Sequence, residues 1–255
     1  MIPSLFVCHG SPMLAIEENV YTLSLRETGE KIHPKAIVIF TAHWENETTT
    51  ISFKDDIYET IYDFGGFSPE LYQVKYPAKG STVIASIVEE RFKTAGISTN
   101  RDENRGLDHG SWVMLHHLYP DADIPVVQIS VNPFLPPKEQ FEIGKALRGL
   151  GEEGILVVGS GGTSHNLWKI HWGQPTPEAW AVEFDDWLID KIQNRDLESL
   201  FNYEILAPNA RLAVPRPEHF VPLFIAMGSG DENKQAKLLH RSYDAGTLSL
   251  ISFEF

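Results

Sequence analysis

The stretch at residues 4–14, SLFVCHGSPML, begins with a continuous apolar run and stops at a histidine, with a glycine and a proline close behind it. A short apolar run without polar alternation is typical of a strand buried on both faces of a sheet. From these residues alone the end of the run has three interpretations: a turn, a nucleophile loop around Ser11, or one corner of a metal site. The positions of the other histidines favour the third.

Three further runs share this pattern, at residues 36–41, 124–131 and 155–158. Amphipathic helices are predicted between them, one of which begins after Ser81, a residue suited to the N-cap. The predicted apolar faces consist of Ile84, Ile87, Val88 and Phe92; of Phe141, Leu147 and Leu150; and of Trp180, Phe184, Trp187, Leu188 and Ile192. The C-terminal residues 248–255, LSLISFEF, predict a late strand with alternating burial.

Strand and helix signals alternate along the chain, with no Gly/Ser-rich linker, charge block or internal repeat. This predicts a single α/β domain over residues 1–255. We expect a central mixed, mostly parallel sheet flanked by helices, with the active site at the carboxyl ends of the strands. Two irregular stretches, at residues 61–79 and 202–222, are long for simple connections and are expected to be functional or mobile.

The composition excludes several classes of protein. A net charge of −14 over 255 residues is unsuited to an extended nucleic-acid interface. No apolar run reaches the roughly 18 residues that a membrane span needs. The N-terminus lacks the basic and apolar regions of a signal peptide, and Cys8 is the only cysteine, so no intrachain disulfide is possible. We therefore expect a cytoplasmic protein in a reducing compartment.

The histidines are more informative by position than by number. His9, His43 and His165 each follow a predicted strand, His219 lies in a proline-stiffened loop, and His109, in the segment GLDHGSW, is a further candidate. Because ligands of open α/β sheets bind beyond the carboxyl ends of the strands, we expect the first three to converge and His219 to join them. The other histidines are expected to have local structural roles; they are His33, His116, His117, His171 and His240.

Several common catalytic motifs are absent. There is no HExxH and no paired CxxC, so spacing alone identifies no zinc site. Residues 159–162, GSGG, fit neither the GxSxG nucleophile elbow nor the GxGxxG dinucleotide motif, and they predict a tight turn where the backbone approaches a ligand. Ser11 has His9 as a nearby base but no third group to orient it, which disfavours a nucleophile there.

Six segments together resemble one enzyme family, the LigB superfamily of class III extradiol ring-cleavage dioxygenases, and within it the DOPA 4,5-dioxygenase-type branch. They are HGSP at 9–12, TAHWE at 41–45, YDFGGFSPELYQVKYPAKG at 62–80, GLDHGSWVML at 106–115, VVGSGGTSHNL at 157–167 and RPEHFVPL at 216–223. The resemblance covers nearly the whole chain. It implies a metal-dependent oxidoreductase that opens the ring of a catechol with O2.

The resemblance also assigns roles to residues. It implies that His9, His43 and His219 bind one divalent metal, Fe2+ or Zn2+. His165 is then the acid/base, with a role as fourth ligand left open, and His109 is a second polar residue facing the substrate. The better-known branch of the superfamily uses two histidines and a glutamate, whereas the PEHF segment here offers both Glu218 and His219, of which this branch uses the histidine.

Substrate contacts are predicted less directly. Trp44 and the aromatic residues of the 61–79 stretch are candidates for the wall of a flat substrate site, and Arg216 for pairing with a substrate carboxylate. Two rival functions remain open: a zinc-dependent hydrolase, and a non-enzymatic interaction protein of the Memo type. The presence of four of the histidines together argues against the latter. The sequence does not decide whether the chain forms a homo-oligomer.

Overall fold

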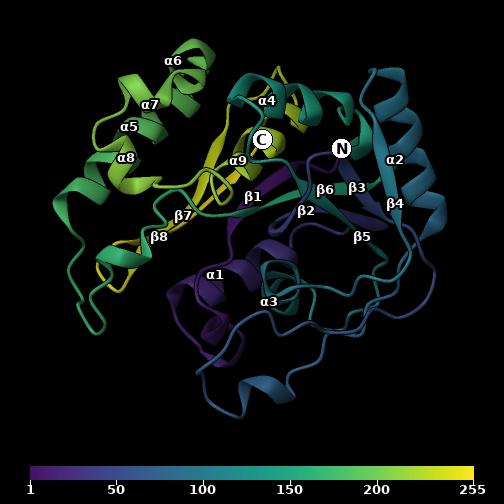
Figure 1. The fold of residues 1–255 in the computed structure, drawn as a ribbon, viewed down its shortest axis with the longest axis horizontal. Helices are drawn as coiled ribbons and strands as arrows, with labels where there is room; N and C mark the ends of the chain where they lie inside the picture. Colours follow the sequence, from purple (N-terminus) through teal and green to yellow (C-terminus); the bar gives the residue numbers. More distant parts are fainter.

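The computed structural model describes residues 1–255 and is built on one sheet of eight strands in the order β4-β3-β5-β2-β6-β1-β8-β7 (Figure 1). The strands are β1 Ser4–Cys8, β2 Ala36–Glu45, β3 Thr49–Ser52, β4 Thr99–Asp102, β5 Val126–Val131, β6 Ile155–Gly161, β7 Lys237–Asp244 and β8 Leu248–Glu254. The four central strands, β5, β2, β6 and β1, run parallel. β8 pairs antiparallel with β1 and β7, and β3 pairs antiparallel with β5. The predicted mixed sheet is confirmed.

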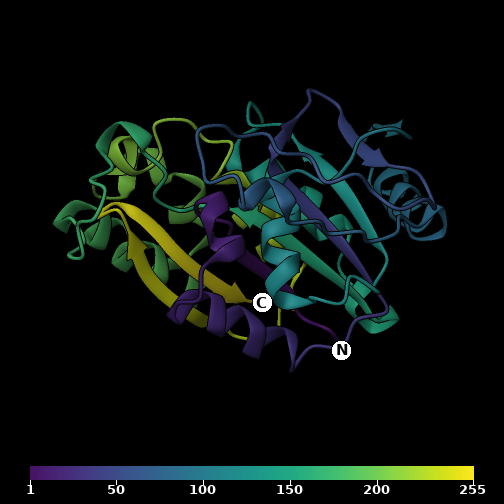
Figure 2. The same ribbon diagram turned by 90° about the horizontal axis from the view of Figure 1, so that it is seen from below.

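Helices cover both faces of this sheet. Helices α1 (Val20–Gly29) and α3 (His109–Leu118) lie on one face, and α2 (Thr82–Thr94), α4 (Pro137–Ala146) and α9 (Val221–Ser229) on the other (Figure 1). A third group, α5 (Ala179–Gln193), α6 (Leu197–Phe201), α7 (Tyr203–Leu206) and α8 (Ala210–Ala213), gathers beside β7 and β8. Short 3-10 helices occupy Pro12–Ile16, Leu71–Gln73, Leu150–Glu153 and Leu167–Lys169. Figure 2 shows the two termini near each other, where Ser4 and Phe255 exchange backbone hydrogen bonds.

Alternation along the buried strands divides the core into two layers. Leu5 and Val7 of β1 pack in the cluster that contains Trp112 of α3, whereas Phe6 packs with Phe224 of α9 on the opposite face. Successive side chains of a strand point to opposite faces, so a strand covered by helices on both sides is apolar throughout. This explains why the central strands were recognisable as continuous apolar runs.

The four predicted core strands are present, but their ends differ from the prediction. β2 continues to Glu45, so His43 lies within the strand and not after it. The pairing of β2 with β5 shifts register between Thr41 and Glu45, so the regular ladder ends where the prediction ended the strand. The predicted tight turn at 159–162 is wrong for its first three residues, since β6 runs to Gly161. β5 begins at Val126, two residues later than predicted.

Some of the other predictions are confirmed and others are wrong. Ser81 is the N-cap of α2 and accepts a hydrogen bond from the backbone N–H of Ile84, as predicted. Leu147 and Leu150 lie beyond the end of α4, so the helix face predicted there is wrong. The 202–222 stretch contains α7 and α8 and is not wholly irregular, whereas 61–79 holds only one 3-10 turn. β8 is buried on both faces, because Leu250 packs in one core cluster and Phe253 in another, so alternating burial is wrong for it.

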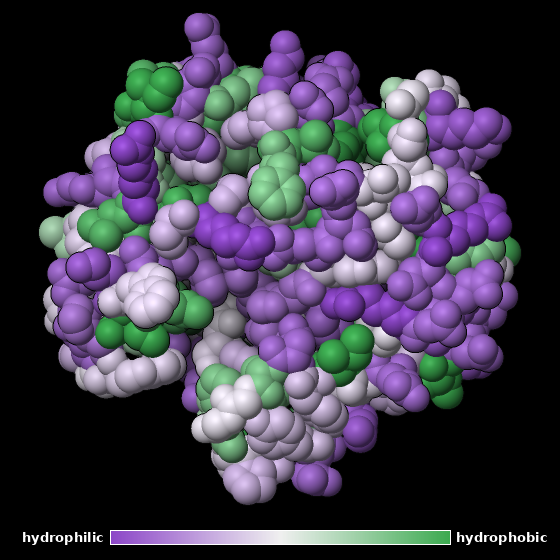
Figure 3. All heavy atoms as spheres, in the orientation of Figure 1, coloured by the Kyte–Doolittle hydropathy of each residue, from purple (hydrophilic) through white to green (hydrophobic).

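The face drawn in Figure 3 is mostly hydrophilic, with apolar residues scattered in small groups. This agrees with the strongly acidic composition. None of the helices combines the length and the apolar character that crossing a bilayer requires.

Candidate metal centre

His9 stands directly after β1 and is 1% exposed. Its backbone N–H donates to the carbonyl of Gly161 at 3.2 Å, which continues the ladder to β6 by one residue. Gly10 then adopts a φ of +56°, in the left-handed region, where a Cβ would lie 2.6 Å from Leu14 and 2.8 Å from Leu250. Only glycine fits such a turn, which directs the chain away and leaves the His9 ring at the carboxyl edge of the sheet.

His43 is placed by the contact between β2 and the first turn of α3. Asp108, the N-cap of α3, accepts a hydrogen bond from the hydroxyl of Thr41 at 2.7 Å and ties the helix to the strand. A Cβ on Gly110 would lie 2.7 Å from that hydroxyl oxygen and 2.9 Å from Cδ2 of His43. The glycine therefore allows the helix to approach the strand closely, with His43 and His109 side by side.

His219 comes from the segment immediately before α9. Its carbonyl accepts a hydrogen bond from the backbone N–H of Gly162 at 2.7 Å, and a Cβ on Gly161 would lie 2.0 Å from the same oxygen. Gly159 makes a similar approach to the carbonyl of Pro222. Gly159 and Gly161 thus allow the segment that carries His219 to pass close to β6. The sequence had suggested a tight turn at these glycines instead.

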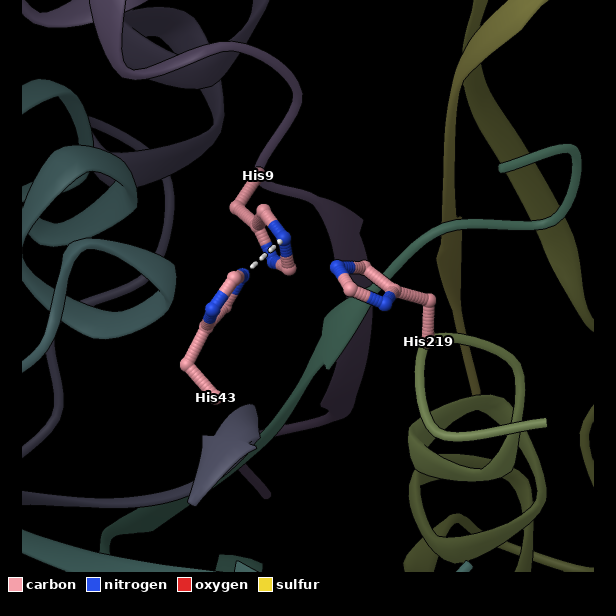
Figure 4. A group of neighbouring side chains, drawn as sticks. All are labelled: His9, His43 and His219. Atoms are coloured by element: carbon pink, nitrogen blue, oxygen red, sulfur yellow. Dashed lines mark hydrogen bonds between the residues drawn. The ribbon is translucent and has the colours of Figure 1, made fainter. Parts of the chain in front are cut away.

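The rings of His9, His43 and His219 point toward one another (Figure 4). Their centroids are 4.7 Å apart for His9 and His43, and 5.0 Å apart for His219 and each of the other two. One nitrogen from each ring lies within 4.8 Å of the others. Of the four histidines expected to converge, the fold brings together His9, His43 and His219 as one possible metal-binding group.

Each of these rings has a protein acceptor at Nδ1. His9 Nδ1 lies 3.1 Å from the hydroxyl oxygen of Ser160, which donates its own proton to the carbonyl of Gly110 and so must accept from His9. His43 Nδ1 lies 3.1 Å from Asp63, and His219 Nδ1 lies 3.0 Å from Glu218. A ring that bears a single proton therefore carries it on Nδ1, which leaves the Nε2 lone pair free.

The free Nε2 atoms are arranged to bind a cation. His9 and His43 bring their Nε2 atoms to 3.0 Å, too close for two lone pairs without a positive charge between them. His219 Nε2 is buried with no hydrogen-bond partner, which is costly unless something binds it. Burial, together with the neighbouring histidines, lowers the pKa of both His9 and His219 well below the ordinary value, so both are neutral. Three imidazole nitrogens suit Fe2+ or Zn2+.

His109 is the first residue of α3, and its ring centroid lies 3.9 Å from that of His43. Its Nδ1–H donates to Asp63 at 2.9 Å, so its Nε2 is free. Burial lowers the pKa of His109, although Asp63 opposes this effect. Burial would raise the pKa of Asp63, but hydrogen bonds from His109 and His43 outweigh it and hold that pKa well below its usual range. Asp63 is therefore an anion beside the rings of His43 and His109.

His165 follows β6 and stacks on His219, with centroids 3.5 Å apart and planes 9° from parallel. An ion bound by imidazole lies in the plane of the ring, and one ion cannot lie in two parallel planes this far apart. The stacked arrangement therefore disfavours His165 as a fourth ligand beside His219. Burial lowers the pKa of His165 to about 4, and the neighbouring His43 and His109 act in the same direction.

The two residues considered for substrate contact have other partners. Trp44 is buried, with the guanidinium of Arg105 4.9 Å from its ring. Arg216 pairs with both carboxylate oxygens of Glu45 and lies 3.6 Å from Glu218. A substrate contact by either residue stays a prediction. The aromatic loop lies closer to the histidines, since the ring of Phe64 is 5.5 Å from that of His109.

Sequence reasoning gave no role to Asp63 or Ser160, the acceptors for His43 and His9. Asp63 lies within one of the six resembling segments, but a lone aspartate in an irregular stretch has no spacing that marks it. Ser160 belongs to a glycine-rich run whose apparent meaning was a turn. Neither residue has a sequence signal, because their contacts join segments distant along the chain.

Comparisons with known proteins agree with this architecture. The family model described as "Catalytic LigB subunit of aromatic ring-opening dioxygenase" matches residues 4–254. The chain is 42% identical to the "4,5-DOPA dioxygenase extradiol" of Beta vulgaris, over 98% of this chain and 95% of that protein. It is 35% identical to a protein of the same name from Escherichia coli (strain K12), over 99% of this chain and 94% of the relative.

A solved structure gives the same result. The crystal structure of an uncharacterized protein from Escherichia coli K12 matches with a TM-score of 0.85 and 33% identity, covering 100% of both chains. The resemblance noted from the six segments is thus confirmed, and it spans the whole fold. This chain belongs to the LigB family of aromatic ring-opening dioxygenases and is an extradiol-type oxidoreductase.

Proposed function

We propose that this protein opens the ring of a catechol with dioxygen in a metal-dependent extradiol cleavage. The observation that carries the proposal is the convergence of three imidazole Nε2 atoms whose Nδ1 atoms all face protein acceptors. Two further histidines, His109 and His165, lie against this group. Such a site leaves coordination positions open for substrates, which is typical of a catalytic metal and not of a structural one.

His9, His43 and His219 are the proposed ligands. A bound Fe2+ supplies Lewis acidity to the two diol oxygens and the redox chemistry that reaction with dioxygen requires. The same donors accept Zn2+, which has no redox chemistry, so zinc would support the rival hydrolase function instead. Overall one O2 is consumed per ring, the carbon–carbon bond beside the diol breaks, and both oxygen atoms enter the product.

His165 is the proposed proton acceptor for a catechol hydroxyl. Its ring is neutral near pH 7, because burial lowers its pKa to about 4. A base must reach the proton that it removes, and an imidazole stacked on the ring of His219 would stand close to a diol held at that centre. The same group returns the proton when the ring opens.

The hydrogen bond to Asp63 determines whether His109 can donate or accept at Nε2. With the proton on Nδ1, its Nε2 accepts a hydrogen bond but does not donate one. Support of a developing oxyanion, as expected from the sequence, therefore requires that His109 first take up a proton. The Asp63 carboxylate stabilises the resulting imidazolium, which then donates from Nε2.

The 61–79 loop is the proposed wall for the aromatic ring of the substrate. Phe64 lies between His109 and the rest of an aromatic group, with centroid distances of 5.5 Å to His109, 6.0 Å to Tyr62 and 5.3 Å to Tyr72. Edge-to-face and tilted contacts at these distances suit the recognition of another flat ring.

The direct experiment is anaerobic reconstitution with Fe2+, followed by a screen of catechols for oxygen uptake and a yellow ring-opened product. The zinc-loaded protein is the matched control and is expected to show neither. If the iron-loaded protein turns over no catechol while the zinc-loaded protein hydrolyses ester or amide substrates, the hydrolase replaces the dioxygenase. If neither form has activity and no metal binds, the Memo-type interaction protein is the better account.

A further inference from the structure

Asp63 is the only residue that contacts two of the site histidines through their Nδ1 atoms. Its Oδ2 lies 3.1 Å from Nδ1 of His43, and its Oδ1 lies 2.9 Å from Nδ1 of His109. Oδ1 also accepts from the backbone N–H of His109 at 3.0 Å, where α3 begins. The side chain is 24% exposed, so these contacts are partly shielded from water.

The arrangement requires a carboxylate and not an amide. Both ring nitrogens must donate to Asp63, because an ionised carboxylate only accepts. An asparagine of the same shape offers one oxygen and one NH2 group, so it can accept from one ring only. The other ring would then face a donor and would have to move its proton to Nε2. In His43, Nε2 is the nitrogen that faces His9.

The other two proposed ligands have separate acceptors, Ser160 for His9 and Glu218 for His219. Glu218 also lies within 4.8 Å of a ring nitrogen of His165, but no hydrogen bond joins the two side chains. Asp63 is therefore the residue that links a proposed metal ligand to a second site histidine through hydrogen bonds. The His43, Asp63 and His109 atoms also lie within range of a shared cation, but each nitrogen–oxygen distance is that of a direct hydrogen bond.

We infer that Asp63 is a positioning residue shared by His43 and His109, which fixes both rings in the Nδ1–H tautomer and turns both Nε2 atoms toward the metal and the substrate. The inference rests on the proposed metal centre. It adds a negative charge next to a site whose three proposed ligands are imidazoles. One substitution at this position is thus expected to weaken metal binding and proton transfer together.

The test compares the full-length Asp63→Asn variant with wild type in two measurements. Titration with Zn2+ is expected to show affinity weaker by roughly 10–100-fold, the usual cost of losing an outer hydrogen-bond partner of a metal ligand. Nitrogen-15 NMR of the imidazoles is expected to show Nδ1–H tautomers for both His43 and His109 in wild type, and an Nε2–H tautomer for one of them in the variant.

Asp55→Asn is the matched control, because it makes the same carboxylate-to-amide change at an exposed side chain, which accepts hydrogen bonds from the backbone N–H and the hydroxyl of Thr82, and leaves Asp63 in place. It is expected to keep wild-type zinc affinity and tautomers. Unchanged affinity and tautomers in Asp63→Asn would overturn the inference. So would an Nε2–H tautomer for either ring in metal-free wild type, a result that does not depend on whether the variant folds.

The two measurements also separate this inference from the proposed function. A wild-type protein that binds no divalent metal contradicts the metal centre, whereas the NMR measurement needs no metal and still tests Asp63. Conversely, a wild-type enzyme that opens catechols while Asp63→Asn matches it in affinity, tautomers and turnover retains the function and removes the role of Asp63.

Discussion

The Nε2 atoms of His9 and His43 face each other at 3.0 Å, although each ring already donates its Nδ1 proton to another group. Neither nitrogen has a proton to offer the other, so the contact is repulsive unless a cation lies between them. The acceptors that produce this arrangement, Ser160 and Asp63, come from β6 and from the 61–79 loop. Two segments that are distant along the chain therefore fix the orientations of the two rings.

The first prediction concerns His219, whose buried Nε2 has no partner in the chain. His219→Ala is expected to lower Zn2+ affinity by more than about 100-fold, since loss of a ligand should exceed the loss of an outer partner. Competition against a chelating dye measures this. His171→Ala, which changes a histidine with a 56% exposed side chain, should bind as wild type does. Wild-type affinity in His219→Ala would remove His219 from the ligand set.

His165 is expected to act on protons and not to hold the metal. His165→Ala should retain wild-type iron content and lose roughly 100- to 10,000-fold in kcat, the usual contribution of a general acid–base. Metal analysis and oxygen uptake on the same preparation measure both quantities. His33→Ala, at an exposed position, is the control for loss of an imidazole. A drop in iron content would instead identify His165 as a ligand, despite its stacking on His219.

Arg216 links β2 to the segment that carries His219, through Glu45 and Glu218. The guanidinium nitrogens of Arg216 are thus occupied by carboxylates of the protein itself. We therefore expect Arg216→Ala to lower kcat/KM to a similar extent for catechols with and without a carboxylate. The unfolding free energy should fall by less than about 1 kcal/mol, as is usual for exposed ion pairs. A loss confined to carboxylate-bearing catechols would show instead that Arg216 binds the substrate, as the sequence suggested.

Cys8 precedes His9 but packs in the core, where burial raises the pKa of its thiol to about 12. The thiolate is the reactive form, so native protein at pH 8 should react with a disulfide reagent only as fast as it unfolds. Stability should decline as pH rises from about 9 toward 12, because the thiol ionises more readily in the unfolded chain. Absorbance of the released thiolate measures the reaction; rapid labelling of the native protein would contradict this burial.

The sequence predicted the parts of the fold that are apolar and regular. β1, β2, β5 and β6 were recognisable because helices cover both their faces. β3, β4 and β7 were not predicted. β4, TNRD, is an edge strand of four polar residues, and β7 is only partly buried along its length, so neither has the continuous apolar signal of the interior.

The site was predicted in part for a similar reason. Histidines after strands can be expected to meet, since the carboxyl ends of parallel strands share one edge of the sheet. The meeting of His9 and His43 follows from this topology, whereas His219 reaches them from the segment before α9. Ring orientation depends instead on Asp63, Ser160 and Glu218, and on the close contacts at Gly110 and Gly161. Such contacts depend on tertiary geometry, which no local pattern encodes.

The most direct test of the central claim is mass spectrometry of the product that the iron-loaded enzyme forms from a catechol under 18O2. A ring-opening dioxygenase places oxygen from 18O2 in the new carboxylate of a ring-opened product, and this is the result that we expect. A product whose new oxygen comes only from water, or a quinone without added oxygen, would contradict the proposed function.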